Sequence, residues 1–155
     1  MQTILAVVEP GNFMKRLVYL IILFSLIITT GCQTALERDK KEMLEIYCND
    51  ENYISLTGEV ITINSNGHNT MVVIKCESLK QHIPDEDDEC EYWVFSNSNL
   101  NITAGDMITY ITVKVRIKNN EWLPIVAINK NGDDILAFNE GKSNLINWVN
   151  QLQMK

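Results

Sequence analysis

Apolar and polar residues alternate through much of the middle of the chain, and this period of two predicts β-strands. The pattern is clearest in GDMITYITVKVRIK (105–118), where odd-numbered residues from Met107 to Ile117 lie on one face and even-numbered residues from Ile108 to Arg116 lie on the other. Four further segments have the same character, at 53–64, 70–76, 92–95 and 121–129. The pattern therefore predicts five short strands.

The interruptions of this pattern predict how the strands are joined. Gly58 breaks the alternation of the first strand, and a glycine within a strand indicates a bulge or a sharp bend. Asn66–Gly67 predicts a turn that pairs the first two strands as a hairpin. Pro124 in the fifth strand favours an edge position or a bulge.

The period changes near the C-terminus and predicts one helix. Leu145, Trp148, Val149 and Leu152 are spaced as i, i+3, i+4 and i+7, and Ser143 is a suitable N-cap residue. We expect a helix of about ten residues that covers one opening or face of the sheet.

The five strands also resemble an OB-fold barrel. The resemblance lies in TGEV (57–60), MVVIKC (71–76), YWVF (92–95) and AGDMITY (104–110), and it covers residues 53–129. The chain departs from it at SNSNLNITA (96–104), a loop where many members have a helix. We expect a mainly β fold, namely a five-stranded OB-like barrel or a curled sheet with a C-terminal helix. The alternatives are another small barrel or an open sheet packed by that helix.

The first third of the chain has a different pattern, that of an export signal. LVYLIILFSLIITT (17–30) carries no charge and follows Met14–Lys15–Arg16. As a helix it would extend about 21 Å, short of the roughly 30 Å hydrocarbon core of a bilayer. A basic start, a short apolar centre and small residues at the end are typical of a signal peptide.

The end of this segment, Gly31–Cys32, resembles the lipobox of bacterial lipoproteins. The resemblance implies that cleavage follows Gly31 and that Cys32 becomes a lipidated N-terminus, although Thr29 departs from the usual aliphatic residue. It also implies a membrane-bound protein exposed outside the cytoplasm. The alternatives are an uncleaved single-span anchor or a plain signal with an incidental cysteine.

These observations predict four regions. Residues 1–13 fit no part of a signal and are interpreted as an extension from a start assigned too early, and 14–31 form the signal. Residues 32–52 form a lipidated tether or short helix, and 53–155 form a single β-rich domain.

The balance of charge limits the partners of the mature chain. From Cys32 onward it carries 19 acidic and 11 basic residues. Because duplex binding depends on Lys and Arg that neutralise phosphates, we expect no duplex nucleic acid partner.

The acidic run DEDDECE (85–91) is a candidate cation site. Its oxygen ligands suit Ca²⁺, and the candidate ligands are Asp85, Asp87, Asp88 and Glu89. The run lacks the glycine and the distal glutamate of an EF-hand loop, so a solvated acidic loop is the alternative. No cofactor is expected.

Three cysteines remain once Cys32 is assigned to lipid. Cys76 follows the second predicted strand and Cys90 precedes the third, so a disulfide between them would close the acidic loop. The alternatives are pairing that involves Cys48, or free buried thiols. His68 and His82 are expected to be exposed polar residues.

The candidate ligand surface lies on the fourth predicted strand. Tyr110, Lys114 and Arg116 share a face there, and Lys118 continues it. Trp93 and Phe95 are expected nearby on the adjoining strand. OB-like domains bind oligonucleotides or oligosaccharides through such basic and aromatic residues. The alternative is a solvated strand face with aromatic residues in the core.

These features favour a non-catalytic binding or adaptor domain on a lipoprotein, with an unknown envelope protein or small ligand as its partner. The alternative is a structural or immunity-type envelope lipoprotein that acts through residues 85–91. We expect no enzymatic activity, because the sequence contains none of the common nucleophile, metal or nucleotide motifs.

Overall fold

The computed structural model describes residues 18–19, 35, 37–67, 69–96, 99–117 and 122–152. The chain divides into two compact units, Lys40–Gln153 and Met1–Asp39 with Met154–Lys155. Within the part of the chain that the structure describes, no helix combines the length and the apolar character needed to cross a membrane.

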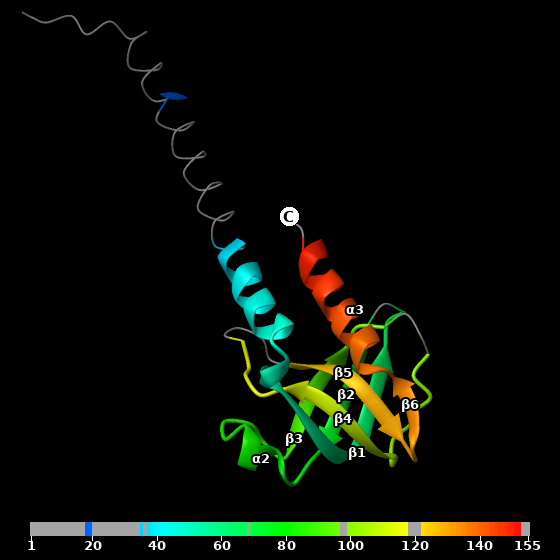
Figure 1. Ribbon diagram of the computed structural model, residues 1–155. Coiled ribbons are helices and arrows are strands. Elements are labelled where there is room, and N and C mark those ends of the chain that lie inside the picture. Colours follow the sequence, from blue (N-terminus) through cyan, green and yellow to red (C-terminus); the bar gives the residue numbers. More distant parts are fainter. Residues whose placement is uncertain are drawn as a thin grey trace, which may run out of the picture. The chain divides into compact units, whose positions relative to one another are not determined.

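The larger unit contains all five predicted strands (Figure 1). Its elements are η1 (Asp50–Asn52), β1 (Tyr53–Ser65), β2 (Thr70–Lys75), α2 (Leu79–His82), β3 (Glu89–Val94), β4 (Met107–Val113), β5 (Leu123–Lys130), β6 (Asp133–Leu136) and α3 (Phe138–Gln151). Residues 37–48 are also helical. The mainly β fold with a C-terminal helix is therefore confirmed, whereas α2 and β6 were not predicted.

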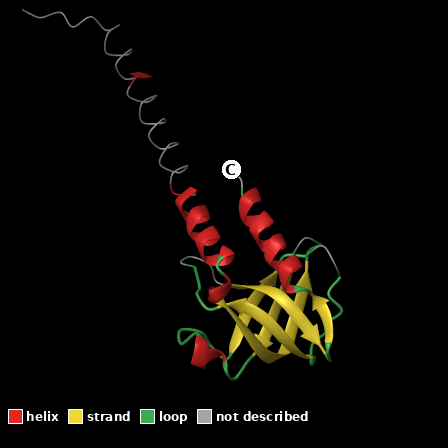
Figure 2. Cartoon of the chain, viewed as in Figure 1, coloured by secondary structure: helices red, strands yellow, loops and turns green. Residues whose placement is uncertain are grey.

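The strands close into a barrel (Figure 2). They hydrogen-bond in the order β3-β2-β1-β4-β5-β6, and a parallel pairing of β3 with β5 joins the two sides of this sheet. The closed barrel thus consists of β1 to β5, with β6 as an extra strand beside β5. This closed five-stranded barrel is consistent with an OB-like fold.

Barrel closure depends on the length and the bend of β1. Its residues 53–59 pair with β4, whereas residues 59–65 pair with β2. A Cβ atom at Gly58 would lie 2.5 Å from Ile74 Cγ2 and 2.7 Å from the carbonyl oxygen of Lys75. Glycine therefore permits the close approach of β1 and β2, as the broken alternation predicted, and the pairing register shifts between Val60 and Thr62.

The C-terminal helix is longer than predicted. It begins at Phe138 rather than near Ser143, and it ends at Gln151. The Ser143 hydroxyl is not an N-cap, because it donates within the helix to the carbonyl oxygen of Asn139 at 2.7 Å. The sequence did not predict this earlier start, because Gly141 lowers the helix propensity of the first turn. Its Cβ would lie closer than 3.0 Å to the Val126 carbonyl, so the glycine lets α3 pack against β5.

Residues 40–52, within the segment predicted as a tether or short helix, belong to the larger compact unit. The compact unit begins at Lys40 rather than near residue 53. Tyr47 is only 1% exposed and belongs to the hydrophobic core. The Tyr53 hydroxyl donates a hydrogen bond to the carbonyl oxygen of Tyr47 at 2.7 Å, which holds the end of the helical segment against the start of β1.

Candidate functional site

Four aromatic side chains gather where β3, β5 and α3 meet. We call them the aromatic cluster: Trp93, Phe95, Trp122 and Trp148. The ring centroids of Phe95 and Trp148 lie 4.5 Å apart, and Trp122 lies 5.6 Å from both. Trp93 joins at 6.0 Å from Trp122. The cluster contains every tryptophan of the chain.

Trp93 enters the cluster because of its position on β3. Successive strand residues point to opposite faces, and Tyr92 and Val94 point into the barrel. Trp93 therefore lies on the outer face, opposite Met71 on β2 and Pro124 on β5. Its indole Nε1 donates to a carboxylate oxygen of Glu91 at 2.7 Å, which fixes the orientation of the ring.

Trp148 comes from the side of α3 next to the buried stripe. Leu145 and Val149 are fully buried beneath the helix, whereas Trp148 is only half-buried. Asn144 and Gln151 are its neighbours one turn away on the same side of the helix. The sequence thus places two amide side chains one helical turn from this indole.

The cluster is partly core and partly surface. Phe95 is 5% exposed and belongs to the hydrophobic core. The three indoles are partly buried and pack against this core. Such rings offer apolar faces and N–H donors to a ligand, and their packing against one another limits the entropy lost on binding.

The prediction that Tyr110 lies on the ligand surface is wrong. It is fully buried, and its hydroxyl lies 3.0 Å from that of Tyr92 within the barrel. Burial raises its pKa well above the ordinary value. The prediction had the two faces of the strand reversed, since Met107 is 57% exposed whereas Ile108 is buried.

Lys114 and Arg116 do not extend this strand, because β4 ends at Val113. The Lys114 ammonium donates to the carbonyl oxygen of Glu51 at 2.8 Å and thereby holds η1. Arg116 binds the buried carboxylate of Glu86 through two nitrogens. Both predicted basic residues thus bind other parts of the chain, Glu51 and Glu86. Lys118 lies outside the described residues.

Glu86, Arg116 and Cys90 form a separate polar contact. The Cys90 thiol donates to Glu86 at 3.4 Å, and an Arg116 nitrogen lies 3.6 Å from its sulfur. Burial, followed by the charge of Glu86, raises the pKa of Cys90 to about 12. The hydrogen bond with Glu86 also raises the pKa of Arg116. This contact joins the acidic loop to the β4–β5 connection.

The predicted disulfide is not formed, since Cys76 and Cys90 are free buried thiols. Cys90 pairs with Ile74 across the ladder, so Cys76 is its diagonal neighbour. Diagonal residues lie about 7–8 Å apart, which exceeds the span of most disulfides. The third thiol, Cys48, is free and exposed.

The predicted cation ligands do not converge. Asp87 and Asp88 each lie within 3.8 Å of the Lys80 ammonium, so a lysine of the chain itself is next to them. Among the described residues, no group of three or more His, Cys, Asp or Glu side chains could hold a metal ion. Asp85 and Glu89 are exposed, as is His82.

Several sequence predictions concern residues outside the described ranges. They are the extension 1–13, most of the signal 14–31, the cleavage position Gly31, the lipidation position Cys32, and His68. These predictions remain predictions.

Sequence reasoning missed two members of the site. Phe95 and Trp93 were considered together, but Trp122 and Trp148 were assigned only to a strand and a helix. Their meeting depends on the parallel pairing of β3 with β5 and on the packing of α3, neither of which has a local signal. Comparison of the chain with protein-family models, with curated proteins and with solved structures finds no match.

Proposed function

We propose that this protein is a non-catalytic binding module, held by a lipid on Cys32 at the outer face of a bacterial membrane, whose ligand contacts the aromatic cluster. The observation that carries the proposal is the meeting of all three tryptophans, each only partly buried, at one position. The position also matches the ligand surface of OB-like barrels, which lies on the second and third strands and the adjoining β1–β2 and β4–β5 loops. Trp93 is on β3, and Trp122 ends the β4–β5 loop.

The charge of the chain narrows the class of ligand. OB-like barrels bind oligonucleotides or oligosaccharides. The net charge of −7 opposes a polyanion, and Arg116 forms an ion pair with Glu86. Indole faces stack on flat ligand surfaces, and the Glu91 carboxylate and nearby amides accept hydroxyl protons. These features favour a neutral oligosaccharide.

The acidic loop supports the alternative function less well. Lys80 already neutralises Asp87 and Asp88 in part, and Arg116 binds Glu86. A basic partner would have to compete with these internal contacts. We therefore assign the ligand to the aromatic cluster rather than to residues 85–91.

Intrinsic fluorescence tests the proposal directly, because all three indoles report on the same site. We would titrate the full-length protein in detergent with soluble N-acetylglucosamine oligomers and with glucan oligomers. We expect a saturable change in emission for one of these series. A single-stranded oligonucleotide of about 20 nucleotides should give no change in emission, since its phosphates lack basic partners at the aromatic cluster.

Substitutions then locate the site. Trp148→Ala should weaken oligosaccharide binding about tenfold or more, because loss of one stacking ring costs about 1–3 kcal/mol. Trp148→Phe, which keeps an aromatic ring in the packing, should weaken it less. Met107→Ala, on a different exposed face, is the matched control and should leave affinity unchanged. Unchanged affinity in folded Trp148→Ala, or no response to any oligomer, would contradict the proposal.

A further inference from the structure

The chain contains two Asn–Gly pairs, and the structure places both in exposed turns between paired strands. Asn66–Gly67 lies between β1 and β2, and Asn131–Gly132 lies between β5 and β6. An asparagine loses its side-chain amide when the main-chain nitrogen of the next residue attacks its side-chain carbonyl carbon, Cγ. A following glycine favours this attack, because it has no Cβ atom to obstruct the approach. By sequence and by exposure, the two pairs are therefore equivalent.

The β5–β6 turn keeps the nitrogen of Gly132 in place. Asn131 and Gly132 have φ values of 56° and 92°. They are the only two residues between Lys130 and Asp133, which pair across the ladder. The Gly132 N–H donates to the side-chain oxygen of Asn129 at 3.0 Å. A rotation that brings this nitrogen to Cγ of Asn131 would break the hydrogen bond and displace the adjacent ladder pair.

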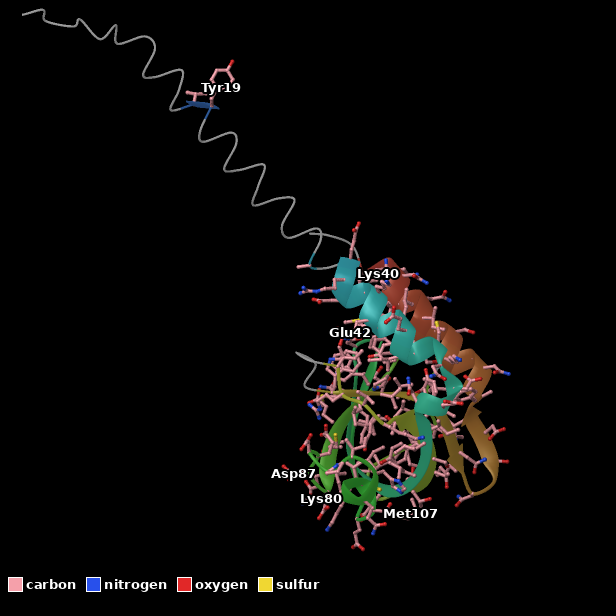
Figure 3. All side chains as sticks on the ribbon, turned by 60° about the vertical axis from the view of Figure 1, so that its left-hand side comes forward. Tyr19, Lys40, Glu42, Lys80, Asp87 and Met107 are labelled. Atoms are coloured by element: carbon pink, nitrogen blue, oxygen red, sulfur yellow. The ribbon has the colours of Figure 1, made fainter. Side chains whose placement is uncertain are left out.

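Side chains on both sides of this turn hold it to neighbouring strands. The Asn129 carboxamide donates to the Asp134 carboxylate on β6 at 2.9 Å. The Lys130 ammonium binds the Asp106 carboxylate at 2.7 Å. Asp106 precedes Met107, which begins β4 and is labelled in Figure 3. The β5–β6 turn is thus fixed at β6 and at the start of β4.

The β1–β2 turn is longer and is held at different atoms. The chain from 66 to 69 lies between the last paired residues of the two strands. The Asn66 N–H donates to the carbonyl oxygen of Asn69 at 3.1 Å, and Asn66 Oδ1 accepts from the Asn69 N–H at 2.9 Å. Neither bond involves the nitrogen of Gly67, which has no hydrogen-bond acceptor among the described residues. A rotation between Asn66 and Gly67 leaves both bonds intact.

The hydrogen bond to Asn66 Oδ1 also favours the reaction itself. Negative charge develops on this oxygen when a nitrogen attacks Cγ, and a donor already 2.9 Å away stabilises that charge. The bond from the Gly67 nitrogen to Cγ forms and the bond from Cγ to the amide nitrogen breaks. Ammonia leaves with the proton of the Gly67 N–H, and a cyclic succinimide remains. Water then opens the ring at either carbonyl and gives aspartate or isoaspartate.

We propose that Asn66 is a site of spontaneous deamidation in the folded protein, whereas the fold protects Asn131. The modification adds a negative charge to the β1–β2 turn. An aspartate keeps the contact with the Asn69 N–H, because its carboxylate is the stronger acceptor. An isoaspartate lengthens the main chain and changes the turn. The reaction depends neither on the lipid anchor nor on the ligand of the proposed function.

Peptide mapping of aged protein tests this assignment. The full-length protein is incubated in detergent at mildly alkaline pH, with and without urea, and the digests are analysed by mass spectrometry and by isoaspartate methylation. In the folded chain we expect Asn66 to convert at least about tenfold faster than Asn131, a difference of about 1.4 kcal/mol in activation free energy. In urea the two rates should become similar. Equal rates in the folded chain, or the same ratio in urea, would overturn the proposal.

Two variants assign the rates to the atoms involved. Asn66→Gln should abolish conversion at position 66, because a longer side chain closes a larger ring slowly. Asn129→Ala removes the acceptor of the Gly132 N–H, and it should raise the rate at Asn131 while the rate at Asn66 stays unchanged. Circular dichroism confirms that each variant is folded. An unchanged rate at Asn131 in folded Asn129→Ala would contradict the protection by this hydrogen bond.

Discussion

Lys142 on α3 donates a hydrogen bond to the main-chain carbonyl of Cys48, 3.0 Å away, at the end of the preceding helical segment. Lys40 in that segment makes the reciprocal contact with the carbonyl of Asn150 near the end of α3. Each lysine therefore places a cation at the C-terminus of the other helix, where the helix dipole and unsatisfied carbonyls favour it.

Replacement of Lys142 should destabilise the fold more than replacement of Lys40. Lys142 also binds the Asp50 carboxylate and lies 5.7 Å from the centroid of the Tyr53 ring, with a side chain only 17% exposed. We expect Lys142→Met to lower the free energy of unfolding by about 1–2 kcal/mol and Lys40→Met by about 0.5 kcal/mol.

Urea denaturation followed by circular dichroism measures both effects. Lys41→Met is the matched control, because Lys41 forms an exposed ion pair with Glu45 and its replacement should have almost no effect on stability. Equal stability of Lys142→Met and Lys41→Met would show that the contacts of Lys142 contribute nothing to the stability of the fold.

Gly141→Ala should separate close packing from helix propensity. Alanine favours a helix over glycine by about 1 kcal/mol. The added methyl group would, however, collide with the Val126 carbonyl on β5. Because overpacking typically costs about 1–3 kcal/mol, we expect net destabilisation and loss of α3 packing. Ser143→Ala in the same helix is the control, and thermal melts should show it near or above the wild-type stability.

The alternation of residues predicted the strands well, but it led to the wrong choice of inner and outer face for β4. In 107–113 both faces carry apolar residues, so Lys114 and Arg116 decided which face was taken as the surface. Those two residues lie beyond the end of β4 and carry no information about its phase. Tyr110 was placed outside for this reason, although the barrel requires it inside.

The unpredicted strand β6 had a local sequence signal in the turn that precedes it. Asn131–Gly132 has positive φ at both residues and forms the tight turn between β5 and β6. Asn-Gly between strands is a strong hairpin signal, and it could have predicted β6. By contrast, the aromatic cluster requires the parallel pairing of β3 with β5 and the packing of α3, which sequence spacing does not encode.

Thiol reactivity should distinguish the three cysteines other than Cys32. In the Cys32→Ser chain at pH 8, we expect one thiol, Cys48, to react rapidly with an aromatic disulfide reagent. Cys76 and Cys90 should react only after unfolding, since both are buried. The thiolate is the reactive form, and with a pKa of about 12 the Cys90 thiol is ionised to only about one part in ten thousand at that pH. A single reactive thiol in denaturant without reductant would instead indicate a disulfide.

Asp106 should contribute to the acid sensitivity of the fold. The Lys130 ammonium, 2.7 Å away, and the Thr103 amide hold the pKa of its carboxyl below the ordinary value. A lowered pKa in the folded state stabilises the protein above the pKa of the unfolded chain, about 3.9, and this contribution is lost as the pH falls through the folded value. We therefore expect wild-type stability, measured as the urea midpoint from pH 6 to pH 2, to fall more steeply than that of Asp106→Asn. Parallel pH profiles for the two proteins would show that this ion pair is not coupled to folding.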